Sequence, residues 1–248
     1  NSGSIAINLT IESGSAITDV GDDTTISASR IGVSALQFQP IVNSYDRWET
    51  FSDWTSRMNG TLGVGSNLFT SFADATGEAE ENSIAFSLNY QGITHDTKAW
   101  VSDRAKLTST GAAGAWSTSA SVAGAGADFS SQAYDFDFDT TIAVHAYNQA
   151  QSLDIAGNAG ALLFIVGTGA GDDGKSLGAS VSDVGYTDNT VAGIGKSATV
   201  DAGAGDLKVD TQSDDSHIVA APTSGVGSGL AFNGIVGVLS MDNTTAAS

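Results

Sequence analysis

The chain has 248 residues, with 30 Gly, 2 Pro and no Cys, and carries a formal net charge of -19. The missing cysteines exclude disulfides, thiolate metal sites and cysteine nucleophiles. Its nine Lys and Arg are scattered, whereas phosphate binding needs clustered basic residues, so we expect no nucleic-acid partner. The strongest apolar run, 161–166, is far shorter than the roughly 20 residues of a membrane helix, so we also expect no membrane insertion.

The N-terminal segment 4–11 alternates between apolar residues and polar or small ones. A period of two is typical of a β-strand with one buried face. We expect the apolar face to be the inward one, and its members are Ile5, Ile7, Leu9 and Ile11. Glu and Met, which are good helix formers, are scarce along the chain, and this also favours strands.

Residues 41–60 depart from the strand pattern, because large side chains recur there at helical spacings of three and four. These side chains are Trp48, Phe51, Trp54 and Met58. Asp46 can cap the first turn of such a helix, and Pro40 suits a departure from a strand. We predict one short helix or loop here, within an insertion that covers 41–82.

Two later segments also indicate strands. Residues 134–139 place three aromatic rings on one side and three Asp on the other, and residues 199–209 fit a strand, a glycine turn and a second strand. Short strands separated by turn residues predict an all-β protein.

An internal repeat organises these strands. Residues 83–107 align without gaps on 176–200, with aliphatic residues at matching positions. The block 188–192 recurs at 242–246 and indicates a third copy, and a weaker fourth copy begins at Ser4. The sequence of residues 139–142 is also similar to that of 23–26.

Repeated strands with small-residue turns are what stacked coils require. We therefore predict a parallel β-helix, or solenoid, over 1–248, with coils of roughly 20–25 residues and an inner wall of Val, Ile, Leu and Phe. The last copy stops at Ser248 without a capping segment, so we expect the chain to be a segment of a longer repeat protein.

The repeated blocks have a recognisable form. Residues 188–209 include Gly-Lys-Ser-Ala-Thr-Val-Asp-Ala-Gly-Ala-Gly-Asp-Leu-Lys-Val, and 230–247 end in Asp-Asn-Thr-Thr-Ala-Ala. Together with 83–107 they resemble the passenger regions of large secreted bacterial adhesins of the filamentous-haemagglutinin-like and autotransporter type. The resemblance fails over roughly 38–80 and 110–135. It implies a right-handed parallel β-helix, secretion to the bacterial cell surface and attachment to cells or surfaces, and it supplies no catalytic residues.

The aromatic residues of the insertion are the candidate ligand-binding residues. Exposed rings on a loop would suit sugar stacking or a protein partner, so the expected partner is a cell-surface glycan or protein. Burial as a small separate core under the insertion is the competing interpretation. The four residues are Tyr45, Trp48, Phe51 and Trp54.

Acidic residues offer only weak candidates for metal binding. Asp135 and Asp137 resemble the start of an EF-hand loop, but the twelfth position is Ala146 and not Glu. We interpret them as an exposed acidic strand face. Other acidic pairs are interpreted as turn residues that could at most hold loosely bound Ca²⁺, and we expect no metal site and no cofactor. These pairs are Asp22 with Asp23, Asp172 with Asp173, and Asp214 with Asp215.

The remaining chemistry is sparse. His95, His145 and His217 lie far apart in sequence, and we expect solvated or turn positions for them. We predict a non-enzymatic structural or adhesive segment of a giant secreted cell-surface protein. The alternatives are a β-helical enzyme that cleaves polysaccharides and a self-assembling extracellular filament or surface-layer component, with association end to end.

Overall fold

The computed structural model describes residues 1–39, 71–73, 82–112, 114–122, 132–157, 168–169, 175–221, 225–226 and 230–248. These residues form an all-β protein with parallel sheets, which confirms the predicted fold class at that level. The expected helix or loop at 41–60 lies outside the described residues, as does nearly all of the expected insertion 41–82. Among the residues described, no helix is long and apolar enough to span a membrane.

Most strands belong to three parallel sheets, which we call sheets A, B and C. Sheet A has the order β1 (Ser2–Val20), β5 (Asn82–Val101), β11 (Lys175–Ile194) and β15 (Leu230–Ala247). Sheet B consists of β2 (Thr25–Ala28), β6 (Lys106–Ser109) and β12 (Thr199–Asp201). Sheet C consists of β3 (Ile31–Phe38), β9 (Ile142–Ala156) and β13 (Leu207–Ala220), with β4 (Ser71–Ala73) also paired to β9.

Two smaller sheets complete the described part. Strands β7 (Trp116–Val122) and β8 (Gln132–Phe138) form an antiparallel hairpin. Strands β10 (Thr168–Gly169) and β14 (Gly225–Val226) form a short parallel pair.

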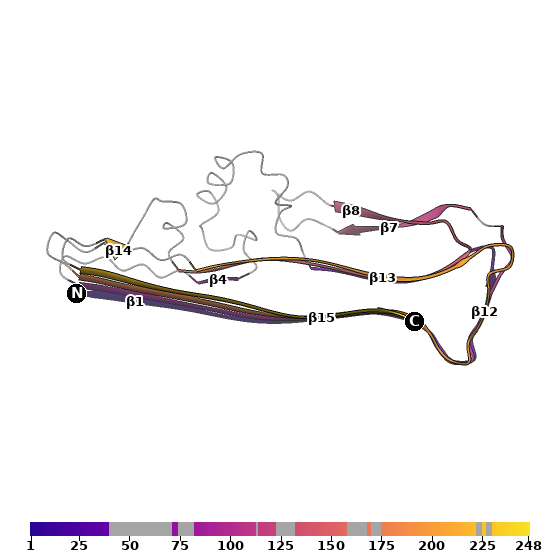
Figure 1. The fold of residues 1–248 in the computed structure, drawn as a ribbon, viewed down its shortest axis with the longest axis horizontal. Helices are drawn as coiled ribbons and strands as arrows, with labels where there is room; N and C mark the ends of the chain where they lie inside the picture. The colour runs from indigo at the N-terminus through magenta and orange to yellow at the C-terminus, as the bar shows by residue number, and fades with distance from the viewer. Residues whose placement is uncertain are drawn as a thin grey trace.

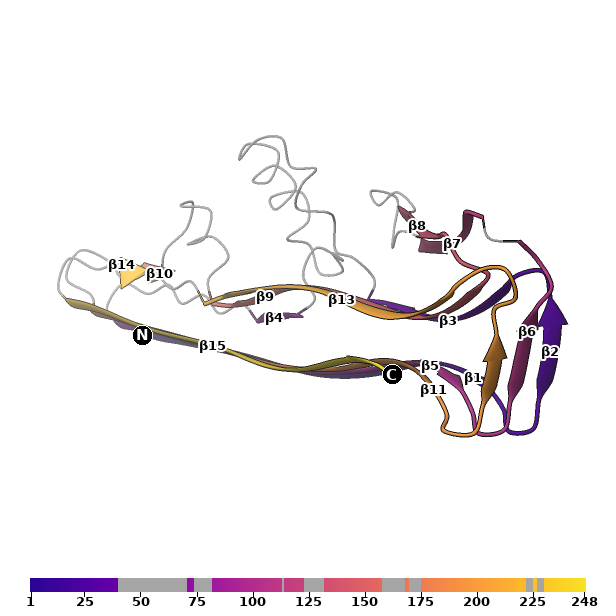
Figure 2. The same cartoon turned by 45° about the vertical axis from the view of Figure 1, so that its right-hand side comes forward.

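The chain passes through the three large sheets in the same order each time. It runs from β1 to β2 and β3, later from β5 to β6 and β9, then from β11 to β12 and β13, and returns to sheet A as β15. Sheets A and C form two layers, and sheet B joins them at one end (Figures 1 and 2). Each pass therefore lies beside the one before it.

The strand register agrees with the sequence alignment over its best-matched part. Ser176 pairs with Ser83 and Val200 pairs with Leu107, so the ungapped alignment of 83–107 on 176–200 is also the spatial pairing. The strands of sheet A have 18 to 20 residues and are longer than expected. Coils of roughly 20–25 residues are also wrong, because hydrogen-bonded partners on successive passes are separated by 81 and 93 residues.

Three weaker sequence matches are wrong in register. Asp188 pairs with Asn243 and not with Asp242, and a one-residue slip of this kind reverses the faces of a strand. Ser83 pairs with Ser2 and not with Ser4, a two-residue slip that preserves the faces. Residues 139–142 do not pair with 23–26, because Ile142 lies in sheet C.

The main hydrophobic core lies where the three sheets meet. Branched aliphatic and alanine side chains from the ends of the sheet A strands, from sheet B and from the start of sheet C pack together there. The fully or nearly fully buried members are Ile31, Val33, Ala35, Ala99, Val101, Ala105, Leu107, Ile142, Val144, Ala146 and Ala192. In this corner the prediction of an aliphatic inner wall is confirmed.

Along the rest of sheet A the aliphatic side chains lie on the outer face, and not on the inner face as predicted. Period-two alternation is present in β1, but Ile5 and Ile7 point outward, with 73% and 68% of their surface exposed. The buried face of β5 instead carries small and polar residues such as Ser87, Asn89 and Gln91. Periodicity identifies two faces of a strand, whereas the packing of sheet C decides which of them is buried.

Candidate functional site

The outer face of sheet A carries a continuous group of aliphatic and aromatic side chains, which we call the apolar patch. It occupies the first half of each strand, and no described element lies over it (Figures 1 and 2). Its members are Ile5, Ile7, Leu9 and Ile11 of β1, Ile84, Phe86, Leu88 and Tyr90 of β5, Leu177 and Val181 of β11, and Phe232, Val236 and Val238 of β15.

The parallel register aligns these side chains into rows that cross the sheet. Ile7, Leu88, Val181 and Val236 are successive partners and form one such row. In the second half of the same outer face, the row of Thr94 is polar and also contains Ser13, Thr187 and Asp242. Further along β1, Ile17 is 59% exposed. The outer face therefore has an apolar first half and a more polar second half.

The outer face of sheet C is covered by the hairpin β7–β8. As predicted, the rings of 134–139 lie on one side of β8 and its Asp side chains on the other. The ring of Phe138 lies 5.5 Å from His145 and that of Phe136 lies 4.9 Å from Tyr147. Burial, together with the charge of Asp214, raises the pKa of Tyr147 to about 12.

The interior between sheets A and C contains a polar network that the sequence did not predict. Asp188 of β11 is 1% exposed, and Asp215 of β13 faces it from sheet C. The Oγ atom of Ser213 lies 2.6 Å from Asp188 Oδ2 and 3.0 Å from Asp215 Oδ2. Because a hydroxyl has one proton, it donates to only one carboxylate, so a proton on the other carboxyl is needed to complete the second hydrogen bond.

The surroundings of both carboxyl groups favour that proton. Burial is the largest influence on each and raises the pKa of Asp188 and of Asp215. Hydrogen bonds from Ser213 and Tyr186 counteract burial at Asp215, where the hydroxyl of Tyr186 donates over 3.1 Å. Asn243 of β15 also donates to Asp215 over 2.8 Å. The two carboxyl groups are fixed by neutral donors within the protein.

Histidines continue the network on either side, contrary to the expected solvated or turn positions. His95 Nδ1 lies 2.9 Å from the Asn148 side-chain oxygen, and Asn148 donates to Tyr186 over 2.8 Å. His217 packs against Tyr186, with ring centroids 4.5 Å apart. Burial, with the charge of His95, lowers the pKa of His217 to about 4, which keeps its imidazole neutral at neutral pH.

A serine, a histidine and an aspartate meet near His217, but their geometry is not that of a catalytic triad. Ser152 Oγ lies 2.8 Å from His217 Nδ1 and donates to Asp154 over 2.7 Å. A nucleophilic serine donates to the histidine, and the carboxylate orients the histidine from its other nitrogen. Here the serine proton goes to the carboxylate, so the three residues form part of the buried network.

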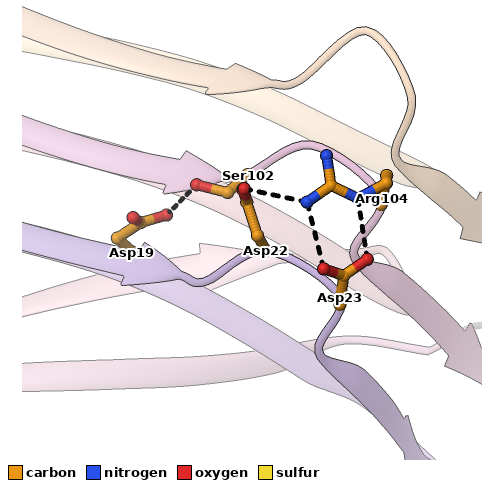
Figure 3. A network of polar contacts seen from close by, with 5 residues as sticks. All are labelled: Asp19, Asp22, Asp23, Ser102 and Arg104. Carbon is orange, nitrogen blue, oxygen red and sulfur yellow. Dashed lines mark hydrogen bonds and ion pairs between the residues drawn. The ribbon is translucent and has the colours of Figure 1, made fainter.

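A further polar group lies on the surface, at the corner between sheets A and B (Figure 3). Arg104 donates to Asp23 over 2.7 and 3.0 Å and to Asp22 over 3.2 Å, while Ser102 donates to Asp19 over 2.8 Å. The hydrogen bonds from Arg104 lower the pKa of Asp23. These contacts join the turns of the first two passes, which agrees with the predicted turn at 22–23.

The structure accounts for only some of the residues singled out from the sequence. Asp135 and Asp137 are exposed on β8, as predicted. Asp214 and Asp215 lie inside β13 and not in a turn, so that prediction is wrong. Residues outside the described part are Tyr45, Trp48, Phe51, Trp54, Asp172 and Asp173. Among the residues described, no group of acidic and histidine side chains could hold a metal ion.

Part of the buried network could have been found from the sequence. The ungapped alignment places His95 directly beside Asp188, and the structure pairs them. Nothing in the sequence places Asp215 opposite them, because that contact depends on how sheet C packs on sheet A. In comparisons with known proteins, no family model, curated protein or solved structure matches this chain.

Proposed function

We propose that the chain is a right-handed parallel β-helix that serves as a non-enzymatic structural and adhesive segment of a large secreted surface protein. The observation that carries this proposal is the repeated passage through sheets A, B and C with every neighbouring pass in parallel register. The crossover connections between parallel strands of one sheet are nearly always right-handed. Stacked passes of this kind build an extended scaffold whose length grows with each added pass.

The surface chemistry supports an adhesive scaffold. The net charge of -19 keeps such a scaffold soluble and discourages nonspecific association. The apolar patch provides an uncovered contact surface on a rigid sheet, and large exposed patches generally mark interaction sites. Secretion and a cell-surface glycan or protein partner remain part of the proposal, on the resemblance of 83–107, 188–209 and 230–247 to adhesin passengers.

The interior carboxyl pair bears on the alternative of a polysaccharide-cleaving enzyme. Glycosidases use two carboxyl groups that flank a sugar bond and reach solvent. Asp188 is buried, and both carboxyl groups accept hydrogen bonds from the protein itself. This arrangement suits a polar core better than a substrate site.

The proposal is tested by comparing attachment with catalysis. We expect the purified chain, immobilised on a surface, to retain cells or glycans in a saturable way, and to release no reducing ends from a panel of neutral and acidic polysaccharides. Release of reducing ends that disappears in both Asp188→Asn and Asp215→Asn would establish the enzyme alternative. No saturable retention in any cell or glycan panel would contradict the adhesive role.

A further inference from the structure

The apolar patch differs from the outer face of sheet C in having no cover among the residues that the structure describes. Sheet C also presents aromatic side chains on its outer face, but there the chain supplies its own cover through β7 and β8. The rows of the apolar patch instead expose side chains such as Ile5, Ile7 and Leu9. The largest continuous apolar patch on a typical monomeric protein covers about 300–600 Å², and such patches are often functional.

The size of the patch can be estimated from strand geometry. Neighbouring strands lie about 4.8 Å apart and each residue advances about 3.3 Å, so the patch measures roughly 20 Å by 25 Å, or about 500 Å². Two such surfaces in contact bury about 1,000 Å² in total, which reaches the lower limit for a specific protein interface. A second copy of the same surface is therefore large enough to cover the patch.

The shape and charge of the patch also fit a second copy. The four strands lie almost flat and in register (Figure 1), and flat apolar sheet faces pack well on one another at about 10 Å. One charged side chain, Asp183, lies between members of the patch, in the row of Leu9 and Tyr90. Acidic residues outnumber basic ones at the other end of the strands, where Asp19, Asp96 and Asp103 lie beside the 22–23 turn that pairs with Arg104.

This distribution of charge selects one arrangement of the two copies. If the strands of the two copies run in opposite directions, the patches overlap and the acidic ends point away from each other. Asp183 then faces the row that contains Ala179 and Gly234, whose small side chains leave room for water around the carboxylate. If the strands run in the same direction, the acidic ends are placed together, which like charges disfavour.

We propose that the apolar patch is a self-association surface, through which two copies of this chain pack face to face with their sheet A strands antiparallel. The dimer has a two-fold axis that lies across the strands near the row of Leu88 and Val181. The dimer cannot add a third copy through the same surface, because each copy has a single apolar patch on sheet A and the contact uses it. The inference goes beyond the proposed function and does not depend on adhesion.

The first experiment measures the molecular mass of the 248-residue chain by sedimentation velocity, from about 1 µM to about 1 mM and at low and high salt. We expect a monomer–dimer equilibrium whose dissociation constant falls several-fold at high salt, because salt screens the repulsion between two acidic copies. A monomer at every concentration and salt would overturn the proposal. Assemblies that keep growing with concentration would also overturn it, since they indicate association through strand edges.

Variants locate the surface. Ile7→Lys and Leu88→Lys should each weaken dimerisation at least tenfold, although both reduce the net negative charge. Thr94→Lys, on the polar half of the same outer face, makes the same change of charge and should weaken it less than twofold. Asp183→Asn should strengthen dimerisation. Equal dissociation constants for the Ile7 and Thr94 variants, in chains with unchanged circular dichroism, would overturn the assignment of the patch.

A distance measurement decides the arrangement. The chain has no cysteine, so a spin label on Asp96→Cys reports a single distance in the dimer. Asp96 lies eight residues beyond Leu88 along β5, and antiparallel packing about the row of Leu88 separates the two labels by about 50 Å. Labels within about 20 Å would overturn the antiparallel arrangement. Binding to neutral phospholipid vesicles by a chain that never dimerises would show that a lipid surface, and not a second copy, covers the patch.

Discussion

The outer faces of sheets A and C have similar side chains and different surroundings. On sheet C, Tyr147 and His145 are 4% and 2% exposed because the hairpin β7–β8 packs over them. On sheet A, Ile7 and its neighbours in the apolar patch remain open. An apolar residue on the outer face therefore contributes to the stability of the monomer only where the chain itself supplies a cover.

The largest expected effect tests this difference directly. Phe138→Ala removes a ring that is 2% exposed and packs against His145 and Trp116, and we expect a loss of about 3–4 kcal/mol in the free energy of unfolding. Ile7→Ala removes a side chain of the open face and should cost less than about 1 kcal/mol. Urea unfolding of both monomers at low concentration provides the measurement. Equal losses would mean that the two outer faces are not different.

A pair of glycines makes the same comparison without removing any contact. A Cβ atom on Gly32 would lie 2.8 Å from the Trp116 ring, whereas a Cβ atom on Gly3 would meet nothing within 4 Å. Gly32→Ala should therefore cost about 1–2 kcal/mol through displacement of the ring. Gly3→Ala should stabilise the chain by a few tenths of a kcal/mol, since it restricts the unfolded state. A neutral Gly32→Ala would show that Trp116 does not pack on sheet C.

A pH-dependent effect concerns the polar interior between sheets A and C, into which His217 of β13 projects. The folded pKa of His217 is about 4, below the ordinary value of 6.5. Its contribution to stability is present above pH 6.5 and is lost as the pH falls through 4. As the pH falls from 7 to 4, the free energy of unfolding of His217→Gln should therefore rise by about 1–2 kcal/mol relative to that of the unmodified chain, after allowance for solvent contact.

The carboxyl groups of the interior network should show the opposite trend. The pKa of Asp215 is raised in the folded state, so its contribution is present below its unfolded pKa and is lost as the pH rises through the raised value. Asp215→Asn removes this loss and should gain stability relative to the unmodified chain as the pH increases from 4 to 8. Urea midpoints across this pH range test both variants, and parallel pH profiles for all three chains would contradict the assigned roles.

The ungapped alignment predicted more of the structure than any single motif. It paired Ser83 with Ser176 because hydrogen-bonded neighbours in a parallel sheet carry similar side chains on both faces. The shorter matches misplaced Asp188 and Ser4 by one and two residues. The repeat was expected to contain small-residue turns, yet its aligned glycines Gly92 and Gly185 lie opposite each other within long strands.

The sequence by itself determined that the chain forms strands with two distinct faces, because alternation at period two is a local property of the backbone. It also determined the register of β5 on β11, since that register follows from residue types. Only the tertiary structure decided which face is buried: sheet C packs on the polar side of sheet A, and the aliphatic side is left outside. The meeting of Asp188 with Asp215 was decided in the same way, because it depends on two layers coming together through sheet B.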